Sequence, residues 1–99
     1  DCSGFTSYVF APFKKELPRR AVDQYQSSRK VDRKNVRKGD LVFFDSGSGI
    51  SHVGIIVSEK GQELTMIHAS SSKGIVVTSI DGTPYWADRV VGFGTFIGN

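Results

Sequence analysis

Residues 41–44 read Leu-Val-Phe-Phe, residues 53–57 read Val-Gly-Ile-Ile-Val, and residues 64–69 read Leu-Thr-Met-Ile-His-Ala. Each run is short, apolar and rich in residues that favour extended backbone, which predicts three buried β-strands. A Gly/Ser-rich turn at 45–49 and a Glu-Lys-Gly-Gln turn at 59–62 separate the runs. Consecutive strands joined by short turns usually pair with each other, so we expect an antiparallel arrangement.

Two more strands are predicted after these, at residues 75–78 and 89–96. Gly92 and Gly94 lie inside the last one, where glycine marks a bulge or a close backbone approach. Between the two strands, Tyr85-Trp86 is expected in a short helical turn or a loop.

The first forty residues have a different pattern. Phe5, Tyr8 and Val9 are spaced i, i+3 and i+4, which predicts a helix that begins near Cys2 and ends near Pro12. A second short helix is expected within residues 20–28, and the basic stretch after it is interpreted as a connection. The sequence therefore predicts an α+β domain in which the N-terminal helix packs on an antiparallel sheet of about five strands.

Composition supports one folded domain of 99 residues, with 38% hydrophobic and 11% aromatic residues. Residues 14–38 hold ten basic and three acidic side chains, a net charge of +7, whereas the whole chain carries +3. Such a segment could face an anionic polymer, but a solvated surface is the more common explanation. Aromatic residues of the kind that stack on bases are nearly absent from it, which argues against a nucleic-acid-binding domain.

Cys2, the single cysteine, stands at the start of the first predicted helix. The unpaired N–H groups and the dipole at a helix N-terminus favour thiolate over thiol, although the adjacent Asp1 carboxylate opposes this effect. A lone cysteine is as often an inert buried thiol, so further residues must decide.

The two histidines, His52 and His68, lie next to neighbouring predicted strands. Pairing these strands outward from the turn places both histidines at the same end, close in space. Cys2 as nucleophile, His52 as base and His68 as the residue that orients His52 would form a catalytic triad. Two alternatives remain: structural histidines at strand ends, and a zinc site built from the same three residues. The second lacks the usual ligand spacing.

The motifs together resemble the NlpC/P60 family of cysteine peptidases. The resemblance is ordered and spans nearly the whole chain. Its motifs are Asp1-Cys2-Ser3-Gly4-Phe5, Leu17-Pro18-Arg19, Lys38-Gly39-Asp40-Leu41-Val42-Phe43-Phe44, Ser51-His52-Val53-Gly54-Ile55, Ile67-His68-Ala69-Ser70-Ser71-Ser72, Pro84-Tyr85-Trp86 and Arg89-Val90-Val91-Gly92.

The resemblance implies a single papain-like catalytic domain over residues 1–99 that cleaves peptidoglycan stem peptides. The implied bond joins D-γ-glutamate to a diamino acid such as meso-diaminopimelate. It implies Cys2, His52 and His68 as catalytic residues, with no metal and no cofactor. The substrate-binding residues that it implies are Asp1, Ser3, Arg19 and Ser51.

The same resemblance implies a monomer in the bacterial cell envelope, periplasmic or secreted, in some members tethered as a lipoprotein. We expect no nucleic-acid partner and no membrane contact by the domain itself. Family members usually carry a tyrosine upstream of the cysteine, so we expect a parent protein to supply sequence before Asp1, including any export signal. A small hydroxyl residue often follows Leu-Pro-Arg in the family, whereas Arg20-Ala21 stand here. A non-catalytic cell-wall-binding module and an amidase or acyltransferase remain as alternatives.

Overall fold

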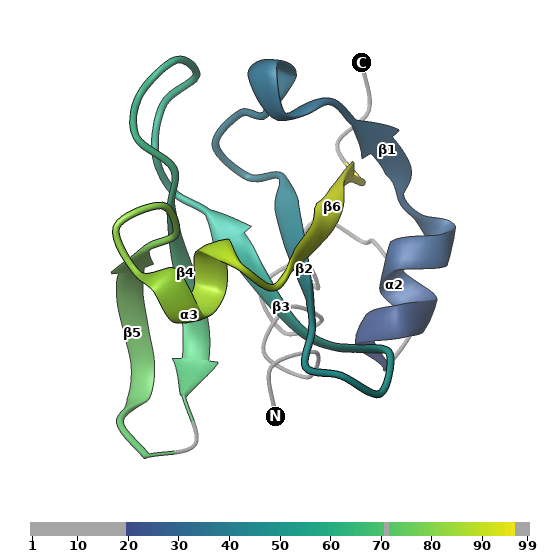
Figure 1. Cartoon of the computed structure of the whole chain (residues 1–99). Helices are drawn as coiled ribbons and strands as arrows, with labels where there is room; N and C mark the ends of the chain where they lie inside the picture. Colours follow the sequence, from purple (N-terminus) through teal and green to yellow (C-terminus); the bar gives the residue numbers. More distant parts are fainter. Residues whose placement is uncertain (1–19, 71, 97–99) are drawn as a thin grey trace.

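The computed structural model describes residues 20–70 and 72–96 (Figure 1). The predicted helix near residues 2–12 lies outside this range, as do Asp1, Cys2, Ser3 and Arg19. The described elements are α2 (Ala21–Ser27), β1 (Arg29–Val31), a 3₁₀ turn (Arg33–Asn35), β2 (Leu41–Asp45), β3 (Ile50–Ile56), β4 (Thr65–Ser70), β5 (Gly74–Ser79), α3 (Pro84–Ala87) and β6 (Val90–Thr95). No helix within these residues combines the length and the apolar character needed to cross a bilayer.

Six strands form one sheet in the order β1-β6-β2-β3-β4-β5, and every neighbouring pair is antiparallel. Strands β2 to β5 follow one another as a meander, whereas β6 returns to the other edge of β2. The predicted α+β class with an antiparallel sheet is confirmed. The number of strands is six instead of the predicted five or so, because residues 29–31, for which the sequence predicts a connection, form strand β1. Strand β1 is short, largely exposed and without an apolar pattern, and its pairing with β6 defines it.

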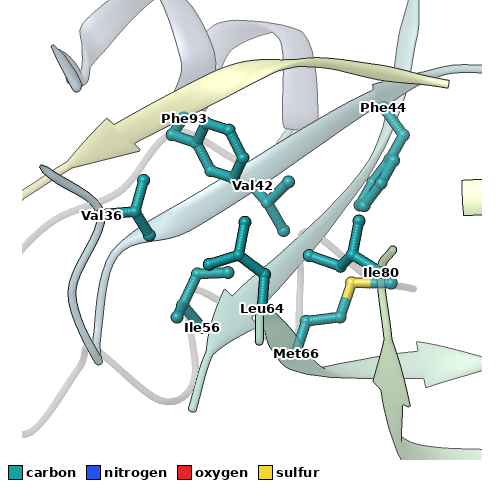
Figure 2. Packing of buried hydrophobic residues seen from close by; sticks show 8 residues of the cluster. All are labelled: Val36, Val42, Phe44, Ile56, Leu64, Met66, Ile80 and Phe93. Carbon is teal, nitrogen blue, oxygen red and sulfur yellow. The ribbon is translucent and has the colours of Figure 1, made fainter. Parts of the chain in front are cut away.

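The sheet separates two apolar clusters because successive side chains along a strand point to opposite faces. On one face, Leu41 and Phe43 of β2 pack with Val53 and Ile55 of β3, and α2 covers them with Ala21. On the other face lies a second cluster, shown in Figure 2. Its buried members are Val36, Val42, Phe44, Ile56, Leu64, Met66, Ile80 and Phe93, with Trp86 of α3 packed against them.

Both glycines of β6 leave room for α2 and the residue after it. A Cβ on Gly94 would lie 2.6 Å from the Cβ of Ser28, and a Cβ on Gly92 would lie 3.2 Å from the Tyr25 hydroxyl. The pairing of β2 with β6 also shifts register between Phe43 and Phe44, beside Gly92. The sequence predicted a bulge or a close approach here, and the structure has both.

Candidate active site

The two histidines meet at one end of the pairing between β3 and β4. His52 Nε2 lies 2.9 Å from His68 Nδ1, a hydrogen bond between two rings that are nearly perpendicular, at 86°. The pairs Ile55–Ile67 and Ile56–Met66 set the register of these strands. Continued along the strands, that register places His52 and His68 on the same face, two residues out of direct opposition. The predicted proximity of the two histidines is confirmed.

A threonine on the next strand extends this contact. His68 Nε2 lies 3.0 Å from the Thr78 hydroxyl oxygen on β5. Met66 is the direct partner of Thr78 and Val76 that of His68, so this bond is also diagonal. His52, His68 and Thr78 therefore form a continuous polar chain across three successive strands.

Two aromatic rings lie close to His52. The indole of Trp86 stacks on the His52 ring at 4.7 Å with an interplanar angle of 21°, and it meets His68 edge-on at 5.2 Å. The Phe44 ring lies 5.9 Å from His52 and 4.8 Å from Trp86. Because Phe44 belongs to the second apolar cluster, the orientation of His52 depends on core packing.

The short helix α3 places Trp86 against His52. Pro84 occupies the start of α3, where its fixed φ suits a first helical turn and its missing N–H is not needed. The Trp86 and Ala87 N–H groups both donate to the Thr83 carbonyl, at 2.9 Å each. The sequence predicts a helical turn or a loop around Tyr85-Trp86, and the structure has a helical turn there.

Burial keeps both imidazoles neutral near pH 7. Desolvation lowers the pKa of His52 from 6.5 to about 4, and the charge of His68 lowers it further. Desolvation also lowers the pKa of His68, whose residue is only 3% exposed. Two buried histidines in contact cannot both become charged at low cost. The pair is therefore suited to hold and pass a single proton.

The two ring nitrogens of His52 also differ in their contacts. Nε2 is engaged with His68, so Nδ1 is the nitrogen left for a proton transfer with another group. His68 can fix the orientation and tautomer of His52 from behind. No group of three or more His, Cys, Asp or Glu side chains within residues 20–70 and 72–96 is arranged to hold a metal ion. The zinc alternative requires Cys2, which lies outside this range.

Ser51 directly precedes His52 and is the second residue of β3, just after the turn that joins β2 to β3. Its hydroxyl lies 2.7 Å from that of Ser46. One carboxylate oxygen of Asp45 accepts hydrogen bonds from Gly47 N at 2.7 Å and Gly49 N at 3.2 Å, and both glycines have positive φ. These hydrogen bonds hold the turn that leads into β3, and His52 is the third residue of that strand. Of the four predicted substrate-binding residues, Ser51 alone lies within the described range.

Two residues at this site, Thr78 and Trp86, were not predicted as functional. Thr78 closes an otherwise apolar run, Ile75-Val76-Val77, and a polar residue there was the available signal. Pairing residues 64–69 with 75–78 around the intervening loop would have placed it near His68. Trp86 belongs to the Pro84-Tyr85-Trp86 motif of the family resemblance, but no local pattern indicates its contact with His52, because that contact depends on how α3 packs against strands distant in sequence.

Comparison with known proteins identifies the family to which this fold belongs. The NlpC/P60 family profile matches residues 1–95, and the chain belongs to that family. The chain is 51% identical over 94 residues to a Listeria seeligeri protein named "Probable endopeptidase p60", covering 95% of this chain and 17% of that protein. It is 41% identical over 90 residues to the Escherichia coli K12 murein DD-endopeptidase MepS/murein LD-carboxypeptidase, covering 90% of this chain and 45% of that protein. The chain thus spans less than half of either relative.

Solved structures show the same fold. An NlpC/P60 family protein from Bacillus cereus superposes with a TM-score of 0.86 at 28% identity, over 99% of this chain and 32% of that one. RipD of Mycobacterium tuberculosis superposes with a TM-score of 0.69 at 25% identity, over 96% of this chain and 62% of that one. RipD is described as a non-catalytic NlpC/p60 domain protein adapted to peptidoglycan binding. Family membership alone therefore does not distinguish catalysis from binding.

Proposed function

We propose that residues 1–99 form the catalytic domain of a cysteine endopeptidase that hydrolyses peptidoglycan stem peptides. The proposed bond lies between D-γ-glutamate and a diamino acid such as meso-diaminopimelate. The observation that carries the proposal is the hydrogen bond between His52 Nε2 and His68 Nδ1, in a domain of the NlpC/P60 family. The endopeptidase names of the p60 and MepS relatives support the same activity.

In the proposed mechanism, His52 Nδ1 takes the proton of the Cys2 thiol, and the thiolate sulfur attacks the amide carbonyl carbon. The tetrahedral intermediate collapses when the His52 imidazolium returns that proton to the leaving amine, which breaks the C–N bond and leaves a thioester. His52 then removes a proton from water, which attacks the thioester carbonyl and releases the carboxylic acid and the Cys2 thiol. His68 keeps the His52 ring oriented throughout.

The pKa of His52 fits this sequence of steps. Its low value describes the site without substrate, where burial, and to a smaller extent His68, disfavours a positive charge on His52. A thiolate formed beside His52 supplies the opposite charge that stabilises the imidazolium. Proton transfer and charge formation at the two residues are therefore coupled, and neither residue needs to be charged alone.

Substrate recognition is proposed for Asp1, Ser3, Arg19 and Ser51, by the family resemblance of their positions. Stem peptides carry free carboxylates, which a guanidinium such as that of Arg19 can bind with two hydrogen bonds. We further propose that the domain acts as a monomer in the bacterial cell envelope, without a cofactor. In that setting the basic segment 14–38 would lie among anionic wall polymers.

The test is an incubation of the domain with defined stem peptides and muropeptides, followed by mass spectrometry of the products. Cys2→Ala serves as the control, because it removes the nucleophile. Cleavage after D-glutamate that is lost in Cys2→Ala is the expected result. Cleavage at a different bond would retain the mechanism and change the specificity, and acylated or amine-transfer products would indicate an acyltransferase.

The second candidate is a peptidoglycan-binding module without turnover, which the similarity to RipD favours. The two functions differ in the chemistry of the thiol. An activated Cys2 reacts rapidly with iodoacetamide well below pH 8, whereas an unactivated thiol does not. Binding of muropeptides without cleavage and without rapid alkylation would replace the proposed activity by this one. The assay should also be run on a chain extended upstream of Asp1.

A further inference from the structure

The polar chain at the candidate active site does not end at His68. His68 Nε2 contacts the Thr78 hydroxyl at 3.0 Å, and this ring nitrogen takes no part in the contact with His52. Thr78 lies on β5, at one end of the order of strands, and its side chain is partly buried. His68 itself is 3% exposed, so a hydrogen on its Nε2 has little access to water. The partner of that nitrogen therefore influences where the proton of His68 resides.

Two arrangements of protons satisfy both hydrogen bonds. In the first, His52 Nε2–H donates to His68 Nδ1, and His68 Nε2–H donates to the Thr78 oxygen. In the second, the Thr78 hydroxyl donates to His68 Nε2, and His68 Nδ1–H donates to His52 Nε2. Only the first leaves His52 Nδ1 without a hydrogen and able to accept a proton. The second places a hydrogen on that nitrogen, so His52 could not act as a base there.

The protonated state of His52 distinguishes these arrangements. An imidazolium carries hydrogen on both nitrogens, so its Nε2–H must donate to His68 Nδ1. His68 then holds its own hydrogen on Nε2 and donates it to Thr78. The first arrangement is thus common to the neutral and charged forms of His52. Proton uptake and release at His52 Nδ1 would therefore leave the hydrogen bonds from His52 to His68 and from His68 to Thr78 unchanged.

We propose that Thr78 is a positioning residue of the reaction, whose hydroxyl oxygen accepts from His68 Nε2–H and holds both histidines in the tautomer that leaves His52 Nδ1 free. This role rests on the proposed peptidase function. Thr78 touches neither substrate nor nucleophile in this scheme and acts through His68 and His52.

The test compares Thr78→Val, which removes the hydroxyl at nearly constant shape, with Thr78→Ser, which retains it. In Thr78→Val, a hydrogen on His68 Nε2 would be buried without an acceptor, which favours moving it to Nδ1. Thr65→Val is the matched control, because it makes the same chemical change on β4 at a position paired with Ser79. The tautomers of His52 and His68 are read from ¹⁵N NMR of histidine-labelled protein at pH 7. The same four proteins are assayed for kcat and KM.

We expect both rings in the Nε2–H tautomer in the unmodified protein, in Thr78→Ser and in Thr65→Val. Thr78→Val should shift both rings toward Nδ1–H and lower kcat by roughly tenfold, about the effect of losing one hydrogen bond, with KM little changed. Unchanged tautomers in Thr78→Val, or equal impairment of Thr78→Ser and Thr78→Val, would overturn the proposal. If the unmodified protein cleaves no stem peptide, the peptidase function fails, yet the tautomers still decide whether Thr78 sets the state of the pair.

Discussion

The two faces of the sheet are built from the same strands but differ in composition. The face under α2 is apolar around Leu41, Phe43, Val53 and Ile55. The opposite face begins as an apolar cluster around Val42 and continues into a polar chain of histidines and a threonine. Phe44 and Trp86 belong to both parts of this second face, since they pack in the cluster and against His52.

Because of this difference, adjacent residues of one strand serve different purposes: one stabilises the fold and the next takes part in the proposed chemistry. In β3, His52 points to the face of the polar chain and Val53 to the face under α2. A change at one position should alter catalysis, and a change at the next should alter folding. Changes at Phe44 and Trp86, where the apolar cluster meets the polar chain, should alter both catalysis and folding. Substitutions at adjacent positions can therefore test whether the two faces are as distinct as their contacts indicate.

The largest effect is expected from His52→Gln compared with Val53→Ala. His52→Gln removes the proposed base and should lower kcat/KM by about 10³-fold, while the free energy of unfolding at pH 7 changes by less than about 1 kcal/mol. Val53 is fully buried, and Val53→Ala should cost about 2 kcal/mol of stability and leave kcat of the folded protein unchanged. Peptide cleavage and urea denaturation measure the two quantities. Cleavage retained in His52→Gln would contradict the assignment of the base.

The second comparison uses two glycines that lie against opposite faces. A Cβ on Gly94 would meet the Cβ of Ser28 at 2.6 Å, and Ser28 is held by its hydrogen bond to the Tyr25 carbonyl at 2.8 Å. A Cβ on Gly54 would meet Met66 at 2.5 Å from Sδ and 3.2 Å from Cβ, so a flexible side chain can partly yield. We expect Gly94→Ala to cost about 3 kcal/mol and Gly54→Ala about 1–2 kcal/mol.

Thermal or urea unfolding measures both glycine variants. Gly54→Ala should also lower kcat several-fold, because Met66 lies two residues before His68 and on the same face. Replacing Ser28 by Gly in the Gly94→Ala protein removes the atoms in conflict and should restore much of the lost stability. An equal cost for the two alanines, or no recovery with Ser28→Gly, would show that these close approaches do not set the stability.

The parts of this architecture that follow local rules were predictable from the sequence. The runs at 41–44, 53–57 and 64–69 are apolar, short and bounded by turns, and these properties define strands without reference to the rest of the chain. The same reasoning predicts that His52 and His68 lie close together, because consecutive strands joined by a short turn usually pair.

The remaining parts depend on contacts between residues distant in sequence. Strand β1 exists because it pairs with β6, more than sixty residues later, as the Lys30–Gly94 pair shows. Trp86 reaches His52 because α3 packs on strands that precede it in the sequence. No periodicity within either segment contains this information. Tertiary contacts of this kind override local pattern, which is why these features were missed.

The pH dependence of stability should report the buried histidine pair. His52 has a pKa near 6.5 when unfolded and about 4 when folded, so the unfolded chain takes up its proton first as the pH falls. Stability from this group is complete above pH 6.5, declines between pH 6.5 and about 4, and is level below. The loss should be on the order of 2 kcal/mol, allowing for partial solvent exposure.

Urea denaturation at pH 7.0, 5.5 and 4.5 measures this slope, and His52→Gln is the control. The variant should lose less stability over the same interval, since its side chain does not titrate. Carboxylates contribute equally to both proteins and cancel in the difference. Identical slopes in the two proteins would mean that the His52 pKa is not lowered by folding.

The smallest effect concerns Phe43 and Phe44, which are adjacent, fully or almost fully buried and on opposite faces. Phe43 packs edge-on against Tyr25 of α2 at 5.0 Å, whereas Phe44 lies against Trp86 and His52. Phe43→Leu and Phe44→Leu should each cost about 1–1.5 kcal/mol, because the substitution is the same and both sites are closed.

Catalysis should separate these two variants where stability does not. Phe44→Leu loosens the rings that hold His52 and should lower kcat by about threefold, while Phe43→Leu leaves it unchanged. Kinetics measured well below the unfolding temperature keep the two effects apart. Equal kcat values would mean that Trp86 and His68 suffice to orient His52, and the junction between core and polar chain would then contribute to folding alone.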